Sequence, residues 1–139
     1  MTSTHQEVSG QREDNLVEDR EAKSEPARKA YTPMSAAIDI EAYLSLVDGR
    51  WKLEILFHLF GGQVQRFSDL EKRIDGISQK MLAQQLRQLE ADGLVLRTAY
   101  PEVPPRVDYR MTAWGQALCP ALDSLLQWGE ARVRMAPPD

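Results

Sequence analysis

Residues 68–111 read SDLEKRIDGISQKMLAQQLRQLEADGLVLRTAYPEVPPRVDYRM, and this stretch decides the fold. Ser68 and Glu71 have the spacing of a capping box, which predicts that Ser68 caps the start of a helix reaching about Ile74. Asp75-Gly76 predicts a turn, and Ser78 then predicts the N-cap of a second helix. The first half of the stretch therefore predicts two short helices joined by a tight turn.

A β-hairpin is predicted to follow the second helix. The buried side of that helix is formed by leucines at helical spacing, namely Leu82, Leu86 and Leu89. Gly93 ends the helix, and residues 94–100 and 106–111 then read as two strands. Three prolines lie between the strands, in residues 101–105. Because proline cannot donate to a strand ladder, these residues predict a stiff hairpin tip.

Further helices are predicted on both sides of this stretch. A stripe at i, i+3, i+4 and i+7 predicts a short helix with the apolar residues Ile40, Tyr43, Leu44 and Val47. Gly49 ends it, and residues 50–60 carry apolar side chains on nearly every side, which predicts a central buried helix. After the hairpin, Thr112 is expected to cap a last helix that reaches about Val133 and that Pro120 bends.

Composition indicates one folded domain with tails. The chain has 139 residues, a formal net charge of −4 and one cysteine. Residues 1–35 contain few large apolar side chains, which predicts a disordered tail. Residues 36–135 are expected to form the domain and residues 136–139 a short C-terminal tail. No apolar run is long enough to span a membrane or to act as a secretory signal, so we expect a cytoplasmic protein without membrane association.

The predicted order of elements is helix, helix, helix-turn-helix, hairpin, helix, which is the layout of a winged helix-turn-helix. We therefore expect a mainly α-helical fold with a small β-hairpin, in which the second helix of the pair enters a major groove of DNA. Glutamine can pair with adenine, lysine or arginine with guanine, and a helix N-terminus can hold a phosphate. The residues expected to contact double-stranded DNA are Ser68, Ser78, Gln79, Lys80, Ala83, Gln84, Arg87, Gln88, Arg97 and Arg106.

The charge of this segment leaves the function open at this point. Within residues 78–110 the basic side chains are Lys80, Arg87, Arg97, Arg106 and Arg110, and the acidic ones are Glu90, Asp92, Glu102 and Asp108. The segment is therefore near neutral, but its charges can separate onto different faces. A glutamine-rich face that is merely solvated explains the same residues. The rival functions are a winged helix used for protein contact and a small-molecule-binding or catalytic protein on this fold.

Residues 38–130 resemble the HxlR family of winged helix-turn-helix regulators. The residues that carry the resemblance are Gly49-Arg50-Trp51-Lys52, residues 66–70, residues 76–82, residues 85–95, residues 100–109, Thr112 and Gly115. The resemblance implies a homodimer that binds operator DNA, with repression expected rather than activation. It also implies that a small molecule or a reactive electrophile can change the affinity.

Two positions depart from the pattern of that family. Family members usually carry a Cys-Pro pair shortly before the first helix, and this chain has Ile38-Asp39 there. A redox switch of that kind is therefore not expected. Ala83 stands where relatives often have threonine or serine, so one base or phosphate contact is missing.

No catalysis, cofactor or metal site is expected. His5 and His58 are far apart, and a metal site needs more ligands at suitable spacing. The sequence has no nucleophile elbow, phosphate loop or paired-carboxylate pattern. Cys119 is expected to be buried and inert, because reactive thiols need exposure and nearby positive charge. Trp51 and Trp128 are expected to lie in the core rather than in a ligand cage.

The predicted last helix is apolar over a wider face than one small core needs, which indicates a homodimer formed through the terminal helices. The expected interface residues are Ile40, Tyr43, Leu44, Val47, Leu118, Leu122, Leu125 and Trp128. Two-fold pairing would place two recognition helices about 34–36 Å apart, so the operator is expected to be an imperfect palindrome.

Overall fold

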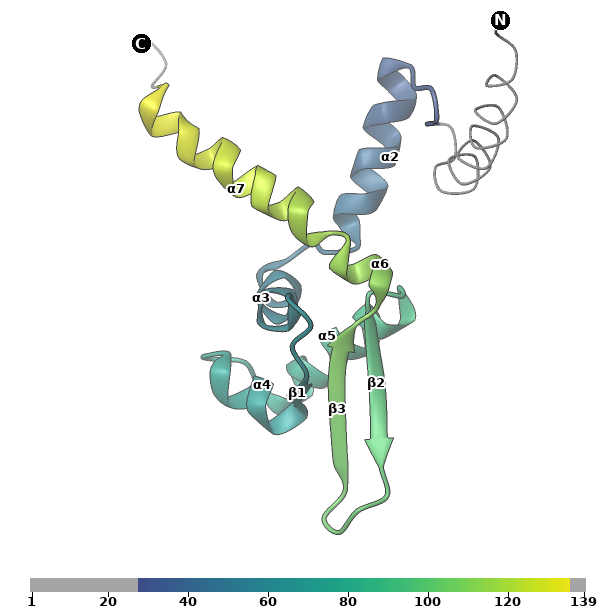
Figure 1. Cartoon of the computed structure of the whole chain (residues 1–139), viewed down its shortest axis with the longest axis vertical. Coiled ribbons are helices and arrows are strands. Elements are labelled where there is room, and N and C mark those ends of the chain that lie inside the picture. The colour runs from purple at the N-terminus through teal and green to yellow at the C-terminus, as the bar shows by residue number, and fades with distance from the viewer. Residues whose placement is uncertain (1–27, 136–139) are drawn as a thin grey trace, which may run out of the picture. The chain divides into compact units, whose positions relative to one another are not determined.

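The computed structural model describes residues 28–135, and most of the predicted N-terminal tail and all of the predicted C-terminal tail lie outside the described residues. The elements are α2 (Pro33–Ser45), α3 (Arg50–Leu59), β1 (Gln65–Arg66), α4 (Phe67–Arg73), α5 (Gln79–Ala91), β2 (Val95–Tyr100), β3 (Arg106–Met111), α6 (Ala113–Gln116) and α7 (Cys119–Arg134). Helices α4 and α5 are followed at once by the β2–β3 hairpin, which extends beyond the helices (Figure 1). The predicted winged helix-turn-helix is confirmed.

Helix α2 begins earlier than its apolar stripe suggests, within the range predicted as tail. Thr32 and Ser35 cap its start reciprocally. The backbone N–H of Thr32 donates to Ser35 Oγ at 3.0 Å, and the N–H of Ser35 donates to Thr32 Oγ1 at 3.1 Å. Pro33 opens the helix, where its fixed φ is favourable and its missing N–H costs nothing. The start was therefore encoded by local capping residues rather than by hydrophobic periodicity.

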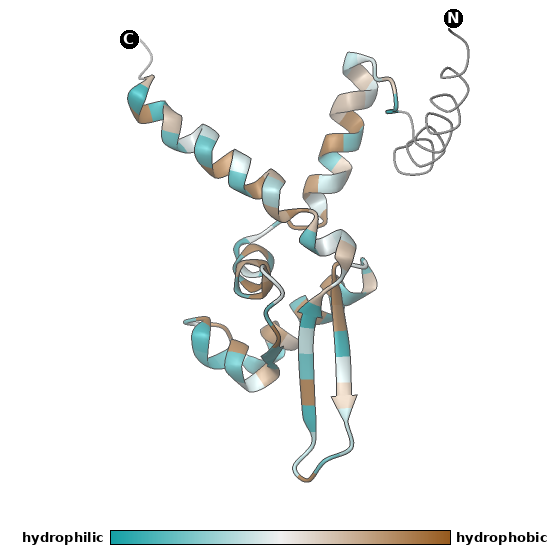
Figure 2. Ribbon diagram, viewed as in Figure 1, coloured by the Kyte–Doolittle hydropathy of each residue, from teal (hydrophilic) through white to brown (hydrophobic). Residues whose placement is uncertain are grey.

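The core forms where α3, α4, α5 and the base of the hairpin meet. Helix α3 contributes Ile55, Leu56 and Leu59, each fully buried. Helix α5 contributes the predicted leucines Leu82, Leu86 and Leu89, which are at most 1% exposed. The prediction of a helix buried on nearly every side is wrong for Phe57, which is 47% exposed. Trp51, Leu53 and Phe60 are half-buried and also pack against the core, and apolar residues dominate the end-on view of α3 in Figure 2.

The hairpin belongs to a three-stranded antiparallel sheet in the described part of the chain, in the order β1-β3-β2. Strands β2 and β3 pair from Val95↔Met111 at the base to Tyr100↔Arg106 at the tip. Strand β1 was not predicted, because two residues are too short to show a period of two. It forms because the free edge of β3 offers backbone partners to the segment that precedes α4.

Helix α4 begins at Phe67, so Ser68 lies inside its first turn and the predicted cap at Ser68 is wrong. The residue before the helix is Arg66, which also ends β1. Its backbone N–H donates to the Asp69 carboxylate at 3.0 Å, and this contact takes the place of the predicted serine–glutamate pair. The strand pairing of Arg66 fixes where the helix starts, and Ser68 is left exposed in the first turn.

The predicted last helix is two helices. Thr112 caps α6 as expected, since the N–H of Gly115 donates to its Oγ1 at 2.9 Å. The helix then ends at Gln116, and α7 begins at Cys119. Pro120 lies in the first turn of α7, where proline is tolerated, and so it does not bend a continuous helix. The short helix α6 at the base of the wing is thus separate from the long terminal helix α7.

The apolar residues of the terminal helices divide into two groups. Val47 and Leu122 are buried within the chain, so the expectation that they meet a second chain is wrong, whereas Leu118 is half-buried and stays an expected interface residue. Ile40, Tyr43, Leu44, Leu125 and Trp128 are all more than half exposed. The expectation that Trp128 lies in the core is wrong, whereas Trp51 packs against the core. Cys119 is half-buried rather than fully buried.

Candidate nucleic-acid interface

Helix α5 is fixed at its start and along its buried side. Gly76 has a φ of 84°, a left-handed conformation that favours glycine and turns the chain between α4 and α5. Ser78 then caps α5 as predicted, because its Oγ accepts a hydrogen bond from the backbone N–H of Met81 at 3.0 Å. Since the leucine side of α5 is buried, its opposite side is turned to solvent.

The exposed side of α5 carries the residues expected to read bases. Gln79, Lys80, Gln84, Arg87 and Gln88 are exposed, and Ala83 is half-buried. The first turn of α5 contains no acidic residue. This side therefore offers amide, ammonium and guanidinium groups that can donate hydrogen bonds to the edges of base pairs.

A hollow of about 490 Å³ separates α5 from the wing. It is lined by Phe67, Ala83, Arg87, Glu90, Arg97, Val107 and Tyr109. Arg87 comes from α5 and Arg97 from β2, so the fold brings one arginine from the recognition helix and one from the wing to the same hollow. Two guanidinium groups across such a hollow form a suitable seat for a phosphate of the DNA backbone.

A second hollow of about 530 Å³ lies between the helix-turn-helix and the wing tip. Its lining brings together Ser68, Gln79 and Arg106, three residues expected to contact DNA. Arg66 of β1 also lines this hollow and was missed by sequence reasoning, because the strand that positions it was not predicted. The candidate interface therefore extends from α5 across both hollows to the tip of the hairpin.

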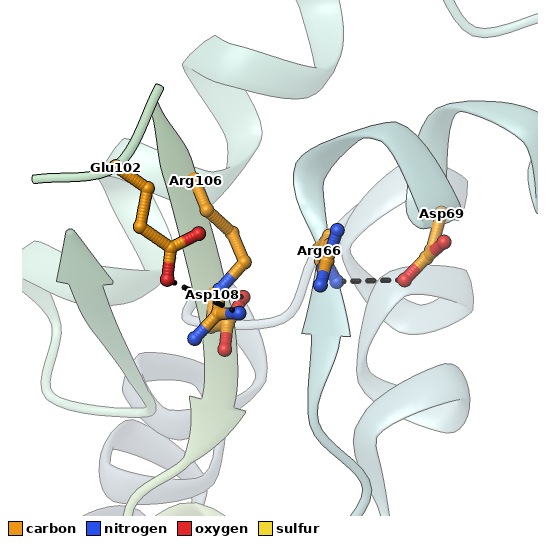
Figure 3. A network of polar contacts seen from close by, with 5 residues as sticks. All are labelled: Arg66, Asp69, Glu102, Arg106 and Asp108. Atoms are coloured by element: carbon orange, nitrogen blue, oxygen red, sulfur yellow. Dashed lines mark hydrogen bonds and ion pairs between the residues drawn. The ribbon is translucent and has the colours of Figure 1, made fainter. Parts of the chain in front are cut away.

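Arg106 is engaged within the wing. Its Nη1 lies 3.5 Å from Glu102 Oε2, and its Nε lies 3.4 Å from Asp108 Oδ1 (Figure 3). The guanidinium carbon also lies 4.0 Å from the centre of the Tyr100 ring, a cation–π arrangement. To contact DNA from the hairpin tip, as expected, Arg106 must therefore exchange one of these contacts for a contact with DNA.

The sequence allowed the basic and acidic side chains to separate onto different faces, and at the two hollows they do not separate. Glu90 lines the first hollow, and Glu71 and Glu102 line the second. Arg110 lies outside both, in a smaller hollow of about 170 Å³ that it shares with Asp108. The positive groups that face the two hollows are thus accompanied by carboxylates.

A buried glutamine anchors the helix-turn-helix to α3. Gln65 is 5% exposed. Its Nε2 donates to the carbonyl oxygen of His58 at 3.4 Å, and its Oε1 accepts from Arg73 Nη1 at 2.6 Å. The side chain thereby joins the end of α3 to the end of α4. Sequence reasoning missed Gln65 because a polar residue in an expected loop gives no signal of burial.

Comparison with known proteins identifies the family. A family model described as HxlR-like helix-turn-helix matches residues 46–136. The chain belongs to the HxlR-like helix-turn-helix family. It is therefore a helix-turn-helix transcriptional regulator by family, and the resemblance inferred from its motifs is confirmed.

Individual relatives agree with this assignment. The chain is 47% identical over 96 residues to YtcD of Bacillus subtilis (strain 168), an uncharacterised HTH-type transcriptional regulator, covering 69% of this chain and 75% of YtcD. A crystal structure of a protein assigned to the MarR family, from Enterococcus faecalis V583, has a TM-score of 0.67 and 40% identity, covering 78% and 96% of the two chains. The redox regulator HypR in its reduced form has a TM-score of 0.62 and 38% identity, covering 68% and 92%.

Two further observations concern the described residues alone. In residues 28–135, no three His, Cys, Asp or Glu side chains are grouped so that they could hold a metal ion. No helix in that part of the chain combines the length and the apolar character needed to cross a bilayer.

Proposed function

We propose that this chain regulates transcription by binding double-stranded DNA, with α5 in a major groove and the β2–β3 wing against the backbone. The observation that carries the proposal is the hollow shared by Arg87 of α5 and Arg97 of β2. A phosphate in that hollow would hold α5 in register with the groove, while Gln79, Gln84 and Gln88 meet the base edges. The role requires access to the chromosome, so we propose a cytoplasmic location.

The test begins with binding to random-sequence duplexes, followed by selection and sequencing of the bound DNA. With the selected operator, Gln84→Ala is expected to cost about 1–3 kcal/mol while leaving affinity for random DNA nearly unchanged. Arg97→Ala is expected to weaken binding to the operator and to random DNA alike. It is also expected to lower the slope of log affinity against log salt concentration by about one per contact. Arg110→Ala removes the same charge outside both hollows and serves as the matched control. A parent protein that binds no duplex would instead support a winged helix used for protein contact.

We propose that the protein binds DNA as a homodimer, and the exposed apolar residues of α2 and α7 support this. Leu125 and Leu126 are each 52% exposed, and Tyr43 and Leu44 are each 54% exposed. Leaving such side chains in water is unfavourable, and a second chain would cover them. A two-fold pair requires an imperfect palindrome, and binding there would repress by blocking access to a promoter.

The dimer is tested by Leu125→Glu, with Ser124→Glu as the control on the neighbouring exposed position. Leu125→Glu is expected to give a largely monomeric protein with sharply lower operator affinity, because one half-site supplies only part of the contacts. Light scattering and operator titrations measure the two effects. A monomeric parent, or a monomeric variant that keeps full operator affinity, would contradict the proposal.

We also propose that an apolar small molecule can act as an effector. A hollow of about 350 Å³ is lined almost entirely by apolar side chains, namely Tyr43, Leu46, Val47, Leu94, Trp114, Ala117, Leu118 and Ala121. This size and lining are typical of small-molecule sites. An anilinonaphthalene sulfonate dye serves as the probe. Ala117→Phe, which fills the hollow, is expected to lower dye binding, whereas Ala113→Phe on the exposed side of α6 is not.

A further inference from the structure

We propose that the two carboxylates around Arg106 have opposite effects on DNA binding: Asp108 positions the guanidinium, and Glu102 competes with a DNA phosphate for it. The inference rests on the proposed function. It adds two residues to the interface that lie outside the set expected from sequence.

The position of the Arg106 guanidinium is set by the strand ladder. Arg106 opens β3 directly opposite Tyr100, which closes β2, so the aromatic ring is held against the guanidinium. Asp108 lies two residues further along β3 and therefore on the same face of the sheet as Arg106. Glu102 comes from the loop beyond the ladder. Asp108 is thus fixed by the sheet, whereas Glu102 is not.

The two contacts differ in their access to solvent. The side chain of Asp108 is 16% exposed, and that of Glu102 is 49% exposed. Arg106 Nε and Asp108 Oδ1 are both shielded from solvent and have no hydrogen bond in the described residues. Their ion pair, at 3.4 Å, is therefore the interaction that offsets the free-energy cost of burying these two atoms. The Glu102 contact lies at the solvent-exposed end of the guanidinium, where replacing the carboxylate by another anion costs little free energy.

The two carboxylates also face different hollows. Glu102 and Arg106 line the hollow that contains Ser68 and Gln79, on the candidate DNA-binding side. Asp108 lines a separate hollow with Val64, Thr98 and Arg110. A phosphate that enters the second hollow, the one lined by Ser68 and Gln79, therefore meets Glu102 but not Asp108. The phosphate and the Glu102 carboxylate carry like charges, so we expect a phosphate that binds Arg106 to displace the carboxylate.

One experiment separates the two roles. The probe is a fluorescent random-sequence duplex of about 30 base pairs, long enough for two half-sites. Fluorescence anisotropy measures its affinity over a series of salt concentrations. Glu102→Gln is expected to tighten binding about two- to fivefold at low salt, the range set by an exposed ion pair. Asp108→Asn is expected to weaken binding, because the guanidinium loses its fixed partner.

Two controls make the result specific to Arg106. Glu130→Gln makes the same charge change at an exposed position of α7 and is expected to leave the affinity unchanged. In an Arg106→Ala background, Glu102→Gln is expected to have no effect, because there is no guanidinium left to release. A gain that persists in that background would show direct repulsion of DNA by Glu102 and would overturn the proposal.

The remaining outcomes are also decisive. Equal gains from Glu102→Gln and Asp108→Asn, or no gain from Glu102→Gln, overturn the inference while the proposed function stands. Failure of the parent to bind any duplex overturns the proposed function itself. If Asp108→Asn does not fold, the Glu102→Gln comparison in the two backgrounds still decides whether Glu102 competes for Arg106.

Discussion

Among the glycines of residues 28–135, Gly115 is the one where an added methyl group is expected to destabilise the fold most. An ideal Cβ on Gly115 would overlap the carbonyl oxygen of Leu94 and would lie 2.7 Å from Met111 Cε. The Leu94 carbonyl cannot easily withdraw, because it accepts a hydrogen bond from the N–H of Thr112 at 3.0 Å. Met111 is 6% exposed, so its methyl group has little space to move. Gly115→Ala therefore forces α6 away from the base of the wing.

The magnitude follows from two opposing terms. Overpacking a well-packed core costs about 1–3 kcal/mol. Replacing a helical glycine by alanine favours folding by about 0.5–1 kcal/mol. The clash involves backbone as well as a buried side chain, so the upper part of the first range applies. We expect Gly115→Ala to lower the free energy of unfolding by about 2 kcal/mol, the difference between these terms.

Gly129→Ala is the matched control, because it makes the same substitution in α7. Nothing lies within 4 Å of a Cβ built on Gly129, so only the helix-propensity gain of about 0.5–1 kcal/mol is expected. Urea unfolding followed by circular dichroism, at one fixed protomer concentration, measures both variants. A Gly115→Ala variant as stable as Gly129→Ala would contradict the expected clash with Leu94 and Met111. A stable Gly115→Ala would mean that α6 can move away from the wing without loss.

The other variants concern one buried, one capping and one half-buried side chain. Gln65→Ala leaves the Arg73 guanidinium without its partner and is expected to lower the free energy of unfolding in urea by about 1–3 kcal/mol. Gln63→Ala, at an exposed position, is expected to change it little. Similar losses from both variants would contradict the anchoring role of Gln65. Ser78→Ala removes the cap of α5 and is expected to cost about 1 kcal/mol by thermal unfolding, and no loss would show that the cap is dispensable. Cys119→Ser is expected to bind DNA with the same affinity as the parent, both with and without a thiol-reactive electrophile. If the electrophile changes the affinity of the parent but not of the variant, Cys119 is a sensor.

Much of the interface could be predicted from sequence because its determinants are close together in the chain. The cap at Ser78, the leucine side of α5 and the hairpin ends depend on neighbours within a few residues. Such neighbours act through helical spacing, turn conformation and strand alternation. The exposed side of α5 follows directly, since burial of the leucines fixes what remains outside. The sequence on its own therefore determined the helix-turn-helix, the wing and the residues of α5 that face solvent.

Tertiary structure decided the features that depend on distant partners. Strand β1 exists because β3 passes beside it some forty residues later in the chain, and that pairing moved the start of α4. Arg106 had the sequence signature of a free wing arginine, and only the register of β2 and β3 placed Tyr100 and Asp108 around it. Val47 and Leu122 look identical in a helical pattern to residues of an exposed stripe. Periodicity reports which face of a helix is apolar, whereas the packing of the whole chain determines whether its own core or another molecule covers that face.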